Sequence, residues 1–112
     1  MSGAELKVQM TGLGLPSIWL ATRLGVYTRT VIRWYEADRI PAKAVAEIEA
    51  ITRLTNAEMH LQLSYLNADG VLRTERANRE GTDLPASWHR ALTFRVLDYA
   101  RSKGLPVEVA YA

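Results

Sequence analysis

The sequence predicts a mainly α-helical protein, in which four to five short helices precede a C-terminal helix and short strand segments. Apolar residues recur at three- and four-residue spacing along most of the chain, and glycines and prolines separate the helical stretches. Hydrophobic residues make up 48% and charged residues 23% of the 112 residues. This composition and length are typical of a folded chain of one-domain size.

A capping-box pattern opens the first predicted helix, because Ser2 is followed three residues later by Glu5. This helix is expected to run to about Met10. It is followed by residues that end one helix and open the next, Gly12, Gly14 and Pro16.

The second and third helices are predicted to be short and to be separated by a turn at Gly25. The second carries an apolar face, formed by Leu20, Ala21 and Leu24. The third is expected over Thr28–Ala37, with Val31 and Trp34 on its buried side.

After a break at Asp38–Pro41, a fourth helix is predicted over Ala42–Leu54, with an inward face of Val45, Ile48 and Ile51. Thr55 and Glu58 form another capping-box pattern, which predicts a separate fifth helix to about Asn67. One long helix that runs straight through is the alternative.

The C-terminal part begins with a turn pattern at Asn67–Gly70 and a short strand at Val71–Thr74. Pro85 opens another helix, which is expected to end near Lys103 with Gly104 in a left-handed conformation. Its first apolar stripe is Trp88, Leu92, Val96 and Tyr99, and its second is Phe94 and Leu97. The alternation at Val107–Tyr111 predicts a final strand.

We therefore expect an N-terminal helical domain over residues 1–67, to which the motif described below assigns DNA binding, and a dimerisation region over residues 68–112. A helix that is apolar on two sides needs two partners. The final strand has no obvious mate, because Val71–Thr74 is short and polar, and a lone strand is not stable. A homodimer would supply a second partner for the helix and a mate for the strand. The residues expected at its interface are Trp88, Phe94, Leu97, Val107, Val109 and Tyr111.

Several function classes lack the residues that they require. The chain has no cysteine and two histidines, which argues against a thiol nucleophile and a zinc site and leaves no metal or cofactor expected. No catalytic motif is present, so we expect a protein that is not an enzyme. No apolar run approaches the ~18 residues of a membrane span, and no signal peptide is apparent, so a cytoplasmic location is expected.

Basic residues are concentrated in one segment. The net charge is +2, with 14 basic against 12 acidic residues and 11 arginines among the former. Residues 23–43 carry five basic and two acidic residues, whereas residues 57–112 carry seven of each. This distribution permits nucleic-acid binding in the first segment.

The spacing from Pro16 to Ala42 is that of a helix-turn-helix, whose second helix lies in the DNA major groove. With Val31 and Trp34 inward, the outward residues that can contact bases are Thr28, Arg29, Ile32 and Arg33. The residues placed to contact phosphates are Ser17, Tyr27, Arg39 and Lys43.

Residues 24–34, LGVYTRTVIRW, resemble the helix-turn-helix of Cro and lambda-repressor type regulators, known as the XRE family. The flanking segments GAEL at 3–6, LGLPS at 13–17 and IPAKAVAEI at 40–48 resemble the same family. Two departures lie after Trp34: Tyr35 precedes the expected glutamate, and Asp38 stands near the place of an expected glycine. The C-terminal part is loosely similar to anti-CRISPR-associated and YdiL-like regulators.

The resemblance implies a sequence-specific transcriptional regulator, a phage or bacterial repressor that acts as a dimer on a palindromic double-stranded DNA operator. Residues 25–42 also resemble phage excisionases and their MerR-like relatives, which leaves an architectural DNA-binding factor as an alternative. An antitoxin-type module with a small protein partner is the alternative outside DNA binding.

Three arginines in the C-terminal part have two possible interpretations: Arg73, Arg76 and Arg79. They form either a second phosphate-binding arm or a solvated loop.

Overall fold

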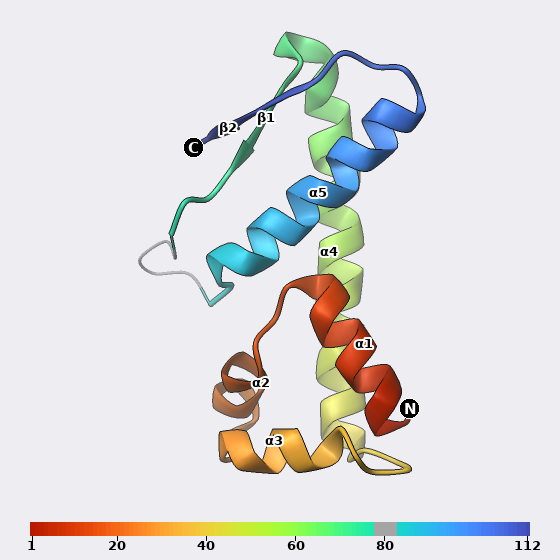
Figure 1. Cartoon of the computed structure of the whole chain (residues 1–112), viewed down its shortest axis with the longest axis vertical. Coiled ribbons are helices and arrows are strands. Elements are labelled where there is room, and N and C mark those ends of the chain that lie inside the picture. The colour runs from red at the N-terminus through yellow and green to blue at the C-terminus, as the bar shows by residue number, and fades with distance from the viewer. Residues whose placement is uncertain (78–82) are drawn as a thin grey trace. The chain divides into compact units, whose positions relative to one another are not determined.

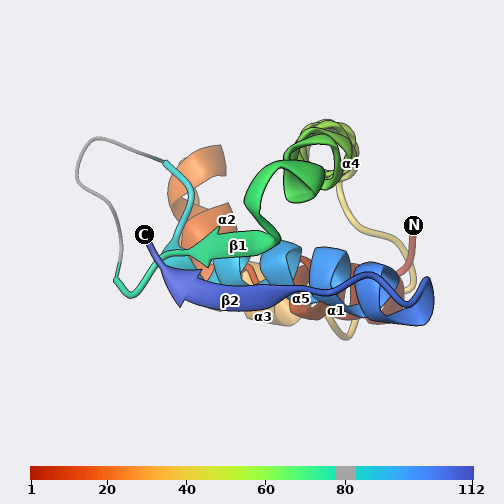
Figure 2. The same cartoon turned by 90° about the horizontal axis from the view of Figure 1, so that it is seen from above.

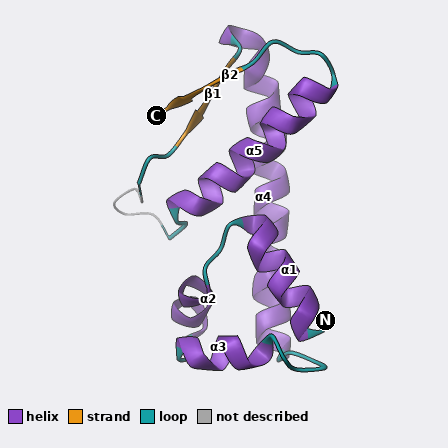
Figure 3. Ribbon diagram, in the orientation of Figure 1, coloured by secondary structure: helices purple, strands orange, loops and turns teal. Residues whose placement is uncertain are grey.

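The computed structural model of the chain describes residues 1–77 and 83–112 (Figure 1). In this part of the chain the fold is mainly α, with five helices and a short two-stranded parallel sheet (Figure 3). The prediction of a mainly helical fold with a C-terminal helix and short strands is confirmed. The elements in chain order are α1 Gly3–Leu13, α2 Ser17–Leu24, α3 Thr28–Trp34, α4 Ala42–Asp69, β1 Val71–Thr74, α5 Ala86–Ser102 and β2 Glu108–Tyr111.

The chain forms two compact units, Met1–Arg53 and Leu54–Ala112, which we call unit 1 and unit 2. The boundary falls inside α4, so this helix contributes its first part to unit 1 and its last part to unit 2. Whether residues 1–67 and 68–112 have the separate roles expected from the sequence stays a prediction.

The first helix begins where its capping pattern predicts. The Ser2 side chain accepts a hydrogen bond from the Glu5 N–H at 3.1 Å, which satisfies one of the free donors of the first turn. The helix continues past Met10 to Leu13. It ends at Gly14, whose φ of 68° is the left-handed conformation that glycine adopts without steric cost.

The third helix is shorter than expected, because it ends at Trp34 rather than Ala37. Beyond it, the N–H groups of Glu36 and Ala37 donate to the carbonyls three residues before them, at 3.1 and 3.0 Å. These tight turns replace the α-helical pattern at the C-terminal end of the helix. Ala37 also accepts a hydrogen bond from the Gly3 N–H at 2.9 Å, which fixes the start of α1 against the end of this segment.

The fourth and fifth predicted helices are one helix, α4, so the alternative of a continuous helix is confirmed. No glycine or proline interrupts residues 42–69. Thr55 does not start a new helix: it is 2% exposed, and its hydroxyl accepts a hydrogen bond from the Trp88 indole N–H at 2.9 Å. No helix in the described part of the chain combines the length and apolar character that crossing a membrane requires.

The final strand has a mate within its own chain, which corrects the expectation that it lacks one. Strand β1 pairs with β2 in parallel, with Val71 opposite Glu108 and Thr74 opposite Tyr111 (Figure 2). Strand β1 is polar in sequence yet contributes to the core, since Leu72 and Thr74 are 3% and 8% exposed. The polar sequence of β1 led to the wrong expectation, because only alternate residues of a strand face the core.

Unit 2 is built around the face that α5 turns toward α4 and the strands. Its buried cluster contains Leu66, Leu72, Val96 and Ala100, with Met59, Leu63, Leu97 and Val107 packed against it. The predicted stripe of α5 is confirmed for Trp88, Leu92 and Val96, which are buried. It is wrong for Tyr99, which is 47% exposed, and Ala100 takes the buried place one turn after Val96.

Candidate nucleic-acid interface

A helix, a three-residue turn and a second helix form the centre of the candidate interface in unit 1. Helix α2 ends at Gly25, whose φ of 68° is left-handed, and the Val26 N–H donates to the Ala21 carbonyl at 2.9 Å. Tyr27 then adopts an extended conformation as the residue that precedes α3. A side chain at residue 25 would strain this turn, so glycine there fixes the angle at which the chain enters α3.

Buried side chains hold the two helices together from one side. Leu20 and Val31 are 0% exposed and Ala21 is 2% exposed, while Trp34 is half-buried. Val31 therefore acts as the anchor of α3, as its position in the sequence predicted. Anchoring through this side leaves the opposite side of a seven-residue helix in contact with solvent.

The residues predicted to contact bases lie mainly on that solvent-exposed side of α3. Arg29 and Arg33 are exposed, Ile32 is 52% exposed, and Thr28 is half-buried at the first position of the helix. Neither arginine forms an ion pair with any residue that the structure describes. Their guanidinium groups therefore have hydrogen-bond donors available for an outside partner.

The residues predicted to contact phosphates have different surroundings. Tyr27 is 82% exposed, Arg39 is exposed in the segment between α3 and α4, and Lys43 is exposed in the first turn of α4. Ser17 is half-buried at the first position of α2, and its hydroxyl forms a hydrogen bond with the Tyr35 hydroxyl at 2.8 Å. Ser17 is therefore held in place by a protein partner before any ligand arrives.

Two residues of this region were not identified from the sequence. Besides its bond to Ser17, Tyr35 carries the Lys7 ammonium group above its ring, 4.7 Å from the ring centre. The contact between Lys7 and Tyr35 joins α1 to the residue that follows α3. The two residues are far apart in the sequence, so a local spacing pattern could not predict that they meet. The departure at Tyr35 from the resembled family was the one available signal.

One basic residue of the segment is neutralised within unit 1. The Arg23 guanidinium forms an ion pair with the Glu47 carboxylate at 2.6 Å, which joins α2 to the first part of α4. Because the pair neutralises one cation and one carboxylate, it leaves the net charge of unit 1 unchanged. Glu36 and Asp38 remain exposed in the segment after α3.

The residues predicted to form a dimer interface do not share one environment. Trp88 is 3% exposed and donates a hydrogen bond to Thr55, so it belongs to the core of unit 2, and its role in an interface stays a prediction. Leu97 and Val107 are half-buried against the same core. The remaining three residues are exposed: Phe94 by 65%, Val109 by 44% and Tyr111 by 54%.

The structure describes two of the three arginines that were expected to form either a phosphate-binding arm or a solvated loop. The Arg76 guanidinium lies above the Tyr111 ring, 4.3 Å from its centre. Arg73 is exposed on β1, and Arg79 lies outside the described residues. These positions give no support to a phosphate-binding arm.

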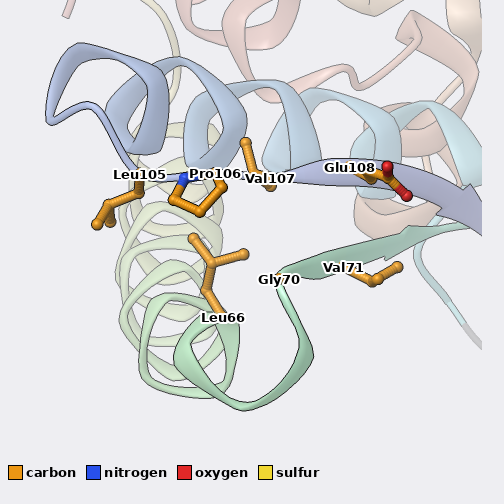
Figure 4. A pocket seen from close by; sticks show the side chains of 7 residues that line it. All are labelled: Leu66, Gly70, Val71, Leu105, Pro106, Val107 and Glu108. Atoms are coloured by element: carbon orange, nitrogen blue, oxygen red, sulfur yellow. The ribbon is translucent and has the colours of Figure 1, made fainter.

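Unit 2 contains an open hollow of about 520 Å³ at the start of both strands (Figure 4). It is lined by Leu66, Gly70, Val71, Leu105, Pro106, Val107 and Glu108. Its one charged side chain is a carboxylate, which would repel a phosphate group. The hollow therefore does not extend the candidate DNA surface.

No protein-family model matches the chain, and no curated protein has significant sequence similarity to it. Within the described residues, no group of three or more carboxylate or histidine side chains is placed to hold a metal ion.

Proposed function

We propose that this protein is a sequence-specific DNA-binding regulator that inserts α3 into the major groove of its operator. The observation that carries the proposal is the two-sided character of α3. Val31 is completely buried, while Arg29, Ile32 and Arg33 project from a helix fixed at its start by the Gly25 turn.

The dimensions and chemistry of this helix suit the groove. An α-helix with its side chains is about 10–12 Å wide, and the major groove of B-DNA is about 12 Å wide. Arginine can donate two hydrogen bonds to the O6 and N7 atoms of guanine, and an apolar side chain can contact the methyl group of thymine. Arg29, Arg33 and Ile32 provide both kinds of contact on one side of α3.

Phosphate contacts would come from residues around this helix. Tyr27 is exposed just before α3, Arg39 is exposed in the segment that follows it, and Lys43 is exposed in the first turn of α4. Such contacts position a protein on DNA without reading its sequence. The regulator would act as a repressor by covering its operator, and a dimer would read two halves of a palindrome.

Selection of bound sites from a pool of random duplexes tests the proposal. The wild-type chain should enrich one motif, whose half-sites should lie about 34 Å apart, or a multiple of that distance, if two copies bind. The double variant Arg29→Ala/Arg33→Ala should lose this enrichment. The matched control removes two exposed unit 2 charges, Arg101→Ala/Lys103→Ala, and should enrich the wild-type motif.

Two outcomes would refute the proposal. One is a wild-type chain that enriches no motif while its circular dichroism spectrum shows a folded helical protein. The other is an α3 double variant that is folded and still enriches the wild-type motif, because base readout would then come from elsewhere.

A further inference from the structure

The outer edge of β2 is the feature of unit 2 that is most suited to bind another chain. The N–H groups of Glu108 and Ala112 donate to the carbonyls of Gly70 and Thr74, at 2.9 and 2.8 Å. Because successive residues of a strand turn their backbone groups to opposite sides, Ala110 also faces β1. The backbone N–H and C=O groups of Val109 and Tyr111 consequently point away from β1, along the outer edge.

This edge belongs to a sheet that is small for its type. An isolated pair of strands is marginally stable, and parallel strands usually occur in larger, covered sheets. In Figure 2, β2 lies on the side of the sheet away from α4. The outer edge of β2 is thus where a further strand can be added.

Apolar side chains accompany the unpaired backbone groups. Val109 and Tyr111 are 44% and 54% exposed, and both line a small hollow with Arg90 of α5. Phe94 is 65% exposed and lies one turn along α5 from Arg90, on the same side of the helix. A strand added at this edge would cover apolar surface as well as form hydrogen bonds.

We infer that the partner is β2 of a second copy, paired antiparallel across a two-fold axis at Val109. A two-fold axis necessarily places the same strand beside itself in opposite direction. The result is a four-stranded sheet in the order β1, β2, partner β2, partner β1. The inference names the partner that operator binding by a dimer needs, and in that respect it rests on the proposed function.

The strand is self-complementary in this arrangement. With Val109 opposite its own copy, Tyr111 lies opposite Val107 of the partner chain, so that apolar residues meet on the side that faces α5. Glu108 lies opposite Ala110 of the partner chain, so the two Glu108 carboxylates do not face each other. A register centred on Glu108 would oppose these carboxylates directly, and it is excluded because the backbone groups of Glu108 are used by β1.

A proline substitution at the outer edge tests the pairing selectively. Val109→Pro removes an N–H group that β1 does not use, so unit 2 should stay folded, as edge positions of sheets tolerate proline. The matched control Val109→Thr keeps the N–H group and the β-branched shape. Light scattering at micromolar concentration, without DNA, should give a dimer mass for the wild type and Val109→Thr, and a monomer mass for Val109→Pro.

Amide hydrogen exchange gives a second measurement that does not depend on the folding of a variant. In the wild type, exchange at Val109 and Tyr111 should become at least tenfold faster when the protein is diluted below its dimerisation range. Exchange at Ala110, which bonds within its own chain, should change much less. A wild type that stays monomeric at all concentrations, a folded Val109→Pro variant that remains dimeric, or unprotected Val109 and Tyr111 amides in the dimer would each overturn the inference. A monomer that still selects a DNA motif would overturn this pairing and leave the proposed function standing.

Discussion

At the scale of single residues, base readout and phosphate binding should respond differently to substitution. Arg33→Ala removes an exposed guanidinium from α3. Affinity for the selected operator should fall by about 1–3 kcal/mol, with a much smaller fall for random duplex, because the bidentate contact to guanine is sequence-specific. Fluorescence anisotropy at one salt concentration measures both. Equal losses on the two duplexes would show that Arg33 contacts phosphate only.

Arg39 is exposed beyond the end of α3 and should contact the DNA backbone. Arg39→Ala is therefore expected to weaken binding to operator and random duplex alike. Because one fewer counterion is displaced, the slope of log affinity against log salt should become less steep by about one. Arg101→Ala, an exposed arginine of α5, is the control and should leave the slope as it is. A slope that Arg39→Ala does not change would remove this residue from the backbone contacts.

Gly3 is required by the closeness of two backbones rather than by its own dihedral angles. A Cβ atom at this position would overlap the Trp34 carbonyl oxygen and lie 2.5 Å from that of Tyr35. Gly3→Ala should destabilise the protein by about 1–3 kcal/mol, because backbone atoms cannot move aside as a flexible side chain can. Gly12→Ala, at an exposed position of the same helix, should instead be neutral or stabilising by up to about 1 kcal/mol. Urea unfolding compares the two, and a Gly3→Ala variant as stable as the wild type would contradict the packing described.

Residue-level predictions succeeded where local spacing carried the information. The Ser2 cap, the Gly25 turn, the buried Val31 and the exposed Arg29 and Arg33 follow from neighbours within a few positions. The contacts among Lys7, Ser17 and Tyr35 could not be predicted, because they join separate segments of the chain and no periodic pattern in the sequence indicates them.

At the scale of elements, the hydrogen bond between Trp88 and Thr55 joins α5 to α4 inside unit 2. A double-mutant cycle with Trp88→Phe and Thr55→Val should show that the two changes are coupled. Trp88→Phe alone should cost about 1–3 kcal/mol, and the double variant should be more stable than the sum of the single effects predicts, by about 0.5–1.5 kcal/mol. Thermal and urea unfolding supply the four free energies. Additivity within about 0.3 kcal/mol would contradict an energetic role for this bond.

The same bond explains why one element was misjudged from sequence. A threonine followed three residues later by a glutamate is a capping pattern, but Thr55 and Glu58 lie inside α4. The Thr55 hydroxyl bonds a tryptophan 33 positions away instead of a backbone N–H at a helix start. Strand β2 was misjudged for a related reason, since its mate β1 lies on the other side of α5 in the sequence. Long-range partners decide both cases, whereas the breaks at Gly14, Gly25 and Gly104 are local and were predictable.

At the scale of the whole molecule, the proposed DNA contacts and the inferred strand pairing belong to different units of one chain. Unit 1 presents the exposed side of α3, and unit 2 presents the outer edge of β2. A single recognition helix covers few base pairs, so a second copy on the same operator would increase the specificity of the proposed binding. The proposal for α3 and the inference for β2 are tested separately, because light scattering needs no DNA.

The measurement that bears most directly on sequence-specific DNA binding is a ratio of two dissociation constants for the wild-type chain. It compares a random duplex with the selected operator, at equal length and equal physiological salt. The account predicts a ratio of about 10³ or more, as is typical of specific regulators. A folded chain that binds both duplexes with a ratio near one, or binds neither, would contradict it.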